Sequence, residues 1–466
     1  MISKGQVDFM ANTTAKDLTV GSPMKLIIRF LIPLLFGMLF QQFYNMVDTM
    51  IIGRFLGVDA LAGVGSTGSV SWLLLGFCMG TCSGFAIPVA QKFGSHDYDG
   101  LRRTVGNILW LSAIIAVVMT LGIASLCRNI LVWMNNPPET ISYAYDYIFI
   151  ILLGIPATIL YNMLAGIIRS LGDSRTPLLF LIFSSILNVI LDLVLILVAK
   201  MGVAGAAVAT VLSQLVSGIL CLVFMVRRFP ILRLSRDDLK LRGDECRMLL
   251  GMGLPMGLQY SITSIGTILM QTAVNNLGAA AMAAVTASDK LGMLLAIPLD
   301  AIGTAAATYV GQNVGAGKLD RIHAGTKANA ILGGIYSIFI FVMIFLFGDL
   351  ALSLFVEPGQ TLIIQMGHQF LTIVSSFYIL LLLVNLLRFS IQGMGFSNYA
   401  MIAGVLEMIA RGAMALLLVP KFGFDAVCFA NPAAWIMADA FLVPMYFYGM
   451  KRLGYKKTKV APEQTL

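Results

Sequence analysis

The stretch "IIRFLIPLLFGMLFQQFYNMVDTMII" at residues 27–52 is apolar over almost its whole length. About 20 mostly apolar residues allow a helix to cross the hydrocarbon core of a membrane. The stretch therefore predicts a membrane-spanning helix over residues 24–55. Asp48 lies near its second end, where a carboxylate is costly in lipid and useful on a pathway for ions or substrates.

The rest of the 466-residue chain has the same character, because 58% of its residues are hydrophobic and only 12% are charged. Soluble domains carry roughly 25% charged residues, so the composition indicates an integral membrane protein. The first 22 residues are polar and lack the apolar core of a signal peptide. The net charge of +8 is typical of basic cytoplasmic loops in such proteins and gives no reason to expect nucleic-acid binding.

Apolar runs between Gly, Pro and charged clusters predict an all-α integral membrane protein with twelve transmembrane helices. The expected spans are 24–55, 60–91, 102–126, 141–168, 176–199, 203–227, 247–275, 280–312, 326–347, 361–390, 398–419 and 426–449. Most Lys and Arg residues fall on one side of these spans. Only Arg54, Arg128, Lys200 and Lys421 fall on the other. The positive-inside rule therefore predicts a multi-pass plasma-membrane protein with both termini in the cytoplasm.

The second half of the chain repeats the first at a nearly constant offset. Pro33 matches Pro255, and "YNMLAGIIRSLGDS" (161–174) parallels "VNLLRFSIQGMGFS" (384–397). An even number of spans per half makes the repeats parallel, and two such lobes suit alternating access about a central cavity. A larger scaffold without transport is the alternative.

The repeat predicts five regions along the chain. They are a cytoplasmic N-terminal tail, an N-lobe of six helices, a basic cytoplasmic linker, a C-lobe of six helices and a basic cytoplasmic tail, at residues 1–22, 23–227, 228–245, 246–450 and 451–466.

Several other classes of function lack their motifs. "GVGSTGS" (63–69) has no Lys and so does not form a nucleotide-phosphate loop, which favours transport driven by an ion gradient. The six cysteines are scattered without a metal-binding pattern. His96, His323 and His368 have no nucleophile pattern beside them. We therefore expect no enzyme, no cofactor and no channel, since a selectivity filter or charged ring is also missing.

Asp48 and Asp192 are intramembrane acids without a basic residue nearby in the sequence. Asn188 precedes Asp192 by one helical turn, so both side chains point the same way. At about 1.5 Å per residue, Asp48 and Asp192 lie at one depth, together with Tyr147 and Thr210. Two carboxylates in a low-dielectric site repel each other, so such a pair can take up a proton or hold a cation. The second half has no equivalent pair.

We therefore expect ion coupling in the N-lobe, with a possible Na⁺ held by Asp48, Asn188, Asp192 and Thr210. The alternative is that each Asp only forms hydrogen bonds within a helix bundle. Of the other intramembrane charges, Glu407 and Arg411 are one turn apart and can form an ion pair. Sequence assigns no role to Asp289, Lys290, Asp300 and Asp439, and it places Arg388 at the end of the tenth span.

Taken together, these features resemble the MATE family, the multidrug and toxic compound extrusion transporters. The resemblance covers essentially the whole chain. It rests on the twelve spans in two repeats, on Pro33 with "YNMVDT" in span 1, on "NVILD" in span 5, and on "GVAGAAVAT" (202–210) in span 6. The resemblance implies a V-shaped cavity between two lobes and export of amphipathic, often cationic compounds, coupled to inward H⁺ or Na⁺.

The resemblance also implies roles for individual residues. In one branch of the family, span 1 bends at the proline corresponding to Pro33. A cation or proton site is formed there by the residues corresponding to Asp48, Tyr147, Asn188, Asp192 and Thr210. A second branch uses acids on spans 7 and 10, and this chain has no acid in either.

We expect the substrate cavity between the lobes to be lined by Gln41, Asn45, Asn162 and Gln259, with Met and Phe neighbours. The chain has 27 Met and 28 Phe, which suit a surface that repacks around varied molecules. The expected partners are small amphipathic cations and the lipid bilayer, with the protein a monomer. A flippase or exporter of a lipid-linked or other endogenous metabolite on the same fold is the main alternative.

Overall fold

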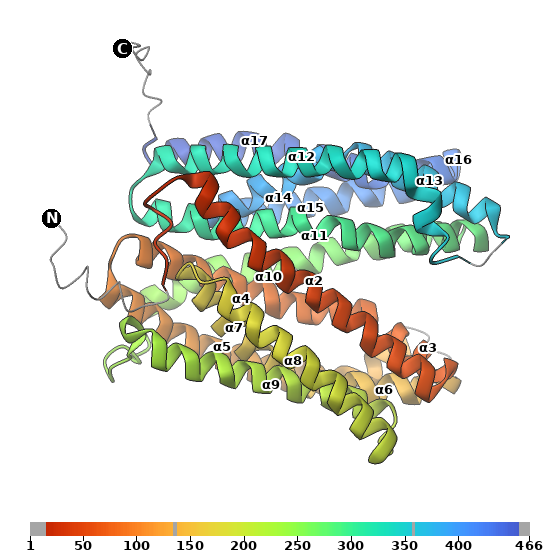
Figure 1. Cartoon of the computed structure of the whole chain (residues 1–466), viewed down its shortest axis with the longest axis horizontal. Helices are drawn as coiled ribbons and strands as arrows, with labels where there is room; N and C mark the ends of the chain where they lie inside the picture. The colour runs from red at the N-terminus through yellow and green to blue at the C-terminus, as the bar shows by residue number, and fades with distance from the viewer. Residues whose placement is uncertain (1–14, 134–137, 357–358, 456–466) are drawn as a thin grey trace, which may run out of the picture.

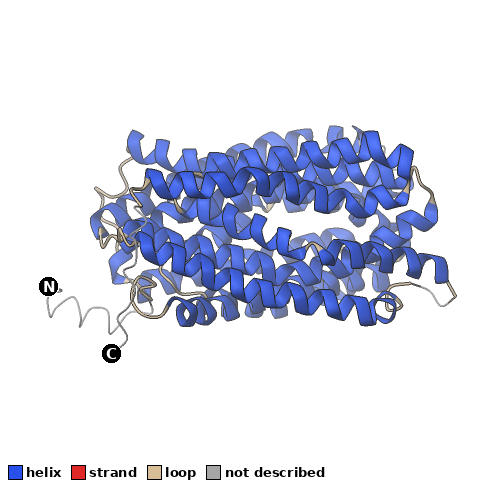
Figure 2. Ribbon diagram, turned by 90° about the horizontal axis from the view of Figure 1, so that it is seen from above, coloured by secondary structure: helices blue, strands red, loops and turns tan. Residues whose placement is uncertain are grey.

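Every regular element in the computed structural model of the chain is a helix, over the described residues 15–133, 138–356 and 359–455. Figure 2 shows these helices running nearly side by side along the long axis, with short loops at both ends. The tail segments 1–14 and 456–466, which belong to the expected N-terminal and C-terminal tails, lie outside the described residues.

The first half of the chain contains eight α-helices, separated by short breaks. They are α2 (Pro23–Leu56), α3 (Val58–Ser66), α4 (Gly68–Gly94), α5 (Tyr98–Trp133), α6 (Pro138–Leu153), α7 (Ile155–Ser170), α8 (Arg175–Leu193) and α9 (Val203–Arg228). The second half contains α10 (Gly243–Asn275), α11 (Ala279–Gly315), α12 (Leu319–Leu352), α13 (Thr361–Ser376), α14 (Tyr378–Gly393), α15 (Ser397–Ala413), α16 (Val419–Phe422) and α17 (Phe424–Arg452).

These helices follow the expected spans, but several of those spans are divided into two helices. The expected span 60–91 is divided into α3 and α4, which meet at Thr67. Among the described residues, nine helices are long and apolar enough to cross a membrane, and the bent pairs α6–α7 and α13–α14 raise the number to eleven. The seventh expected span, 247–275, is the helix α10, which is not among these eleven. Its buried face carries polar residues, including Gln259 and Ser264.

The repeat in the sequence is also a repeat in backbone geometry. The bend between α6 and α7 is 47° and the bend between α13 and α14 is 50°. Left-handed glycines that end or connect helices occur at matching positions, at Gly57 and Gly278 and at Gly202 and Gly423. Glycine tolerates this conformation because it has no Cβ. Each half therefore turns its chain at the same places.

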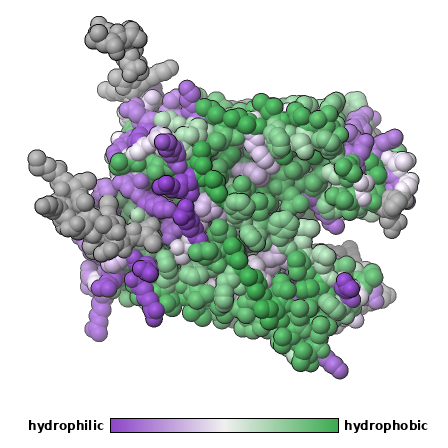
Figure 3. Space-filling view, viewed as in Figure 1, coloured by the Kyte–Doolittle hydropathy of each residue, from purple (hydrophilic) through white to green (hydrophobic). Residues whose placement is uncertain are grey.

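Each half has its own hydrophobic core. One cluster of buried residues extends from Cys78 to Leu249, and a second extends from Val274 to Met450. Figure 1 shows the two groups of helices as two layers, with both ends of the described chain at the same end of the molecule. Figure 3 shows a notch between the two groups at the opposite end, and a broad apolar band around the middle. The lobes therefore diverge at the end remote from the termini.

Helix α2 contacts both lobes. Near its start, Phe30 and Leu34 pack against Ala301 and Ala305 of α11 in the second half. Near its end, Ile51 and its neighbours pack against Ala206 of α9 and Ile196 in the first half. In Figure 1 this helix crosses diagonally from one layer to the other. A change in its shape would therefore act on both lobes.

The end of the molecule near the termini is closed by contacts between the lobes. The segment before α2 lies between them: the backbone N–H of Leu18 donates to Oε1 of Gln312 at 2.8 Å. Nε2 of Gln312 donates in turn to the carbonyl of Ser170 in α7 at 2.8 Å. Lys16 donates its N–H to the carbonyl of Leu171 at 2.8 Å. Gln312 is fully buried at this crossing.

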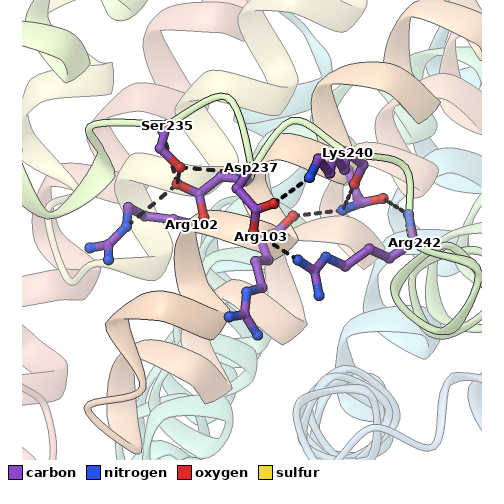
Figure 4. A network of polar contacts seen from close by, with 8 residues as sticks. Arg102, Arg103, Ser235, Asp237, Lys240 and Arg242 are labelled. Carbon is purple, nitrogen blue, oxygen red and sulfur yellow. Dashed lines mark hydrogen bonds and ion pairs between the residues drawn. The ribbon is translucent and has the colours of Figure 1, made fainter.

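The expected linker 228–245 is folded onto α5. Nε1 of Trp110 donates to the carbonyl of Leu239 at 2.9 Å, and the N–H of Arg242 donates to Oδ1 of Asn107 at 2.9 Å. Figure 4 shows Asp237 between Lys240 and Arg242, with ion pairs of 2.7 and 3.1 Å. The linker therefore lies against the first lobe.

Candidate functional site

The two acids that sequence places at one depth lie beside each other. Asp48 comes from α2 and Asp192 from the last turn of α8, and their carboxyl groups lie close enough to interact with each other. Asp48 is 8% exposed and Asp192 is fully buried. One oxygen of each carboxyl group, Oδ1, has no hydrogen-bond partner among the described residues. A buried acidic pair of this kind has a strong tendency to bind a positive charge.

Asn188 connects this pair to α9. Its Nδ2 atom lies 3.4 Å from Oγ1 of Thr210. When the amide is turned over, it donates to Oδ2 of Asp192 at 3.2 Å and accepts from the backbone N–H of Thr210 at 3.3 Å. Asn188 is fully buried and Thr210 nearly so. The α-helix ends just after Asp192 and continues as a π-helical turn, Val194–Val198, a feature that often occurs at functional sites.

Tyrosines surround the same carboxylates. Tyr147 of α6 lies near Asp48, Asp192 and Tyr44, as its electrostatic coupling to all three indicates. Tyr44 lies close to Gln214 and Thr210 and lines the same cavity as both of them. The structure thus brings together all five residues that sequence places at the ion-coupling site.

Tyr44 and Gln214 were missed by the sequence reasoning. Tyr44 precedes Asp48 by one turn, and Gln214 follows Thr210 by one turn. The one-turn spacing that links Asn188 to Asp192 would have identified both.

A cavity of about 240 Å³ in the first lobe opens beside these residues. Gln41, Asn45 and Asn162, which sequence assigns to the substrate cavity, line it together with Tyr147 and Thr210. The remaining lining is mixed, with aromatic and apolar side chains beside hydroxyls; it includes Trp72, Leu75, Met79, Tyr161, Ser184 and Gln214. The cavity therefore suits a molecule with both apolar surface and polar groups.

Gln259 does not line this cavity, contrary to the sequence expectation. It is 5% exposed and accepts a hydrogen bond of 2.7 Å from Nε2 of Gln392 in α14. Its side chain also packs against Gly404 of α15. Helix α10 turns this face toward its own lobe, so the amide is satisfied inside the second lobe.

A second space, of about 450 Å³, lies between the lobes. Ser69 and Trp72 line it from the first lobe, and Arg388, Glu407 and Arg411 line it from the second. Glu407 forms ion pairs with Arg388 and with Arg411, the latter at 3.5 Å. The expected Glu407–Arg411 contact is present. Arg388, however, is not a residue at the membrane boundary; it is 6% exposed and belongs to this buried network.

The other intramembrane acids lie in the second lobe. Asp289 lines a cavity of about 340 Å³ with Arg411, Asn431 and several aromatic residues. Oδ1 of Asp300 accepts from Nδ2 of Asn385 at 2.7 Å. Neither carboxylate oxygen of Asp439 has a hydrogen-bond partner in the described part of the chain. These acids lie apart from the Asp48–Asp192 pair.

The polar atoms around Asp48 are mainly oxygens. Within the residues that the structure describes, no three His, Cys, Asp or Glu side chains form a group that could hold a metal ion. The pair offers carboxylate, amide and hydroxyl oxygens, which are hard ligands. Two free carboxylate oxygens leave room for a proton or for a small monovalent cation.

Comparison with known proteins identifies the family. The MatE family profile matches residues 33–194 and again residues 255–416, one match in each half. The chain belongs to the MATE family. It is 31% identical over 362 residues to the "Probable multidrug resistance protein YoeA" of Bacillus subtilis, covering 75% of this chain and 77% of that protein. It is 23% identical over 343 residues to the "FAD transporter" of Shewanella oneidensis, covering 72% and 75%.

Solved structures agree with this assignment. The fold matches an outward-facing conformation of a multidrug resistance MATE family transporter of the MOP superfamily with a TM-score of 0.86, at 22% sequence identity, covering 95% of this chain and 98% of that one. The predicted all-helical membrane fold is confirmed by this match. Membership of the MATE family confirms that the protein is a transporter and not an enzyme.

Proposed function

We propose that this MATE protein is a secondary antiporter that exports amphipathic, often cationic compounds in exchange for inward H⁺ or Na⁺ bound at the N-lobe carboxylates. The observation that carries the proposal is the buried Asp48–Asp192 pair, with unpartnered oxygens, beside a mixed polar and aromatic cavity. The relative named as a multidrug resistance protein supports drug-like substrates. The cavity fits such molecules because its lining combines aromatic side chains with hydroxyls and amides.

The proposed cycle uses the shape of α2. Pro33 interrupts the hydrogen bonding of this helix, at the level where it packs on α11. Binding of a proton or cation would remove the repulsion between Asp48 and Asp192 and let α2 move about Pro33. Since α2 contacts both lobes, this movement would lower the affinity of the cavity for the exported compound and promote return of the lobes. Exchange then follows from the alternation between the two states.

The orientation is part of the proposal. With both termini in the cytoplasm, the open end of the molecule faces outward and the contacts of Gln312 close the cytoplasmic side. The hydrophilic residues gathered at the end with the termini support this orientation (Figure 3). We further propose that the unit of transport is a monomer in the plasma membrane, because each lobe has its own core and the cavity is complete within one chain.

The test is efflux of a fluorescent cation from proteoliposomes under separate pH and Na⁺ gradients. Asp48→Asn and Asp192→Asn each remove one member of the pair and should abolish gradient-driven efflux. Asp59→Asn is the matched control, because Asp59 is exposed on α3 of the same lobe. Full activity of both variants at the pair would contradict the coupling site, and the gradient that drives the wild type would identify the ion.

One observation favours a second candidate, export of an anionic endogenous metabolite. Arg388 and Arg411 face the space between the lobes, where a cationic drug would be repelled by an excess of positive charge. The relative named as an FAD transporter is consistent with such a substrate. The same liposomes loaded with an anionic dinucleotide, or with labelled lipid to detect scrambling, distinguish these functions from cation export.

A further inference from the structure

A basic pocket lies at the end of the molecule near the termini, outside the transport cavities. It has a volume of about 510 Å³ and lies where the first turns of α2 and α8 meet. Its cationic side chains are Lys25 and Arg29 of α2 and Arg175 of α8. Lys25 and Arg29 are one turn apart and therefore lie on the same face of α2. All three are exposed.

These cations have no anionic partner in the described residues. No ion pair joins Lys25, Arg29 or Arg175 to a carboxylate there. Asp173, two residues before Arg175, is already engaged: its oxygens accept from the N–H groups of Arg175 and Thr176, at 3.0 and 3.1 Å, and from the Thr176 hydroxyl at 2.6 Å. It caps α8 and leaves the guanidinium of Arg175 free.

The local field is positive for two further reasons. Helix α2 begins here without an acidic residue in its first turn and without a side-chain cap, so its positive dipole end is uncompensated by side chains of the helix. Lys16 lies close by, and burial together with the guanidiniums of Arg175 and Arg29 holds the pKa of its amine below the ordinary value. Burial is the largest cause of this shift, the two guanidiniums add to it and Asp173 opposes it, so Lys16 is a further basic group beside the pocket.

The pocket also has an apolar wall. Leu26, Ile28, Ile32 and Pro33 complete its lining, and Ile32 is 47% exposed. These residues lie on α2, which is long and apolar enough to cross a membrane. They belong to its first turns, next to the charged end of the molecule. An anion with an attached hydrocarbon portion would satisfy the cations and cover Ile32 at once. Inorganic phosphate would satisfy only the cations.

We propose that Lys25, Arg29 and Arg175 bind the phosphate headgroup of an anionic phospholipid from the adjacent leaflet, with its glycerol and upper acyl chains against Ile28 and Ile32. The site is separate from the Asp48–Asp192 pair and does not depend on the direction or ion of transport. Since Pro33 lines the same pocket, an occupied site also restrains the first turns of α2 against α8.

The experiment measures binding of phosphatidylglycerol to the full-length detergent-solubilised protein by native mass spectrometry, with phosphatidylcholine and inorganic phosphate as comparison probes. The wild type should bind phosphatidylglycerol at least tenfold more tightly than either probe, with an affinity that falls as salt is raised. The triple variant Lys25→Gln, Arg29→Gln, Arg175→Gln should lose this preference.

The matched control removes three other exposed arginines, by Arg227→Gln, Arg228→Gln and Arg233→Gln. It changes the net charge equally and should leave the preference intact. The charge-preserving variant Arg29→Lys, Arg175→Lys should retain binding, which separates loss of the site from a folding defect. Equal binding of phosphatidylglycerol by the pocket triple and the control triple would overturn the proposal. Equal affinity for inorganic phosphate or for phosphatidylcholine would overturn the assignment to an anionic lipid.

Discussion

Gly94 of α4 and Gln312 of α11 are in backbone contact, so that a Cβ atom on Gly94 would lie 1.9 Å from the carbonyl oxygen of Gln312. The relationship is reciprocal, because a Cβ on Gly315 would lie 1.8 Å from the carbonyl oxygen of Gln91. The two glycines occupy matching positions of the repeat. The lobes therefore meet where the side chains on both helices are smallest, and this contact closes the end near the termini.

We predict that Gly94→Ala and Gly315→Ala each disfavour this closed arrangement. A Cβ in so close a contact forces the helices apart, at a cost of about 1–3 kcal/mol. That cost shifts the balance of the two transport states roughly 10- to 100-fold toward opening at this end. A thiol-labelling assay on a cysteine placed at residue 91 should show faster modification in the variants. Gly334→Ala, where a Cβ meets open space on α12, should behave as wild type.

We predict that Pro33→Ala impairs transport without unfolding the protein. Alanine restores a backbone donor and straightens α2 at the point where it must change shape, so the protein should melt at a similar or higher temperature while efflux falls. Efflux from proteoliposomes and thermal unfolding in detergent are measured together. The repeat-related Pro255→Ala is the comparison, since α10 carries no acid beyond Asp244 and Glu245 in its first turn. Equal loss of transport in both variants would count against a special role for α2.

We predict that Arg388→Gln destabilises the second lobe. The variant leaves buried Glu407 with only the 3.5 Å contact to Arg411. Removing one partner of a buried ion pair costs about 3–5 kcal/mol of stability. Because Arg411 still contacts Glu407, we expect a loss at the lower end, about 3 kcal/mol. The double variant Arg388→Gln, Glu407→Gln should recover much of this loss in a thermal unfolding assay. Arg227→Gln, at an exposed site, should have no effect.

We predict a pH-dependent contribution to stability from Asp97, which lies before α5. Its Oδ1 accepts from the N–H of Gly100 at 2.9 Å, and its Oδ2 forms an ion pair with Lys92 at 2.7 Å. The interaction with Lys92 is the largest cause, and the hydrogen bond from Gly100 the second, that holds the pKa of the Asp97 carboxyl below its ordinary value. Because the pKa of this carboxyl is lower in the folded state, the ionised group stabilises the protein above about pH 4. This stabilisation is lost as the pH falls through the folded-state pKa.

Asparagine retains the cap, so Asp97→Asn should lower stability at neutral pH only by the value of an exposed ion pair, about 0.5 kcal/mol, and the difference from wild type should shrink as the pH falls below about 4. Thermal unfolding in detergent at several pH values measures this. Asp146→Asn, at an exposed position within α6, is the control. A difference that stays constant with pH would show that the charge of Asp97 does not contribute.

The sequence predicted the helices and the acidic pair because both depend on distance along the chain. The regular rise of a helix places Asp48 and Asp192 at one depth, and the proximity of their carboxyl groups agrees with that reasoning. Gln259 and Arg388 could not be placed in this way. Their surroundings depend on how α10 and α14 are rotated about their axes, which only the packing of α15 against them determines. The break at Thr67 was missed because "GVGSTGS" is continuous with apolar residues on both sides.

The hydrogen bond from Leu18 to Gln312 has a consequence for biosynthesis. It joins residues 294 positions apart, so a ribosome must translate most of the chain before the N-terminal segment meets its acceptor. Until then the exposed N–H and the start of α2 have only the first half to bind. The nascent protein can insert its early helices one after another, but the end of the molecule near the termini becomes closed only as a late step of assembly.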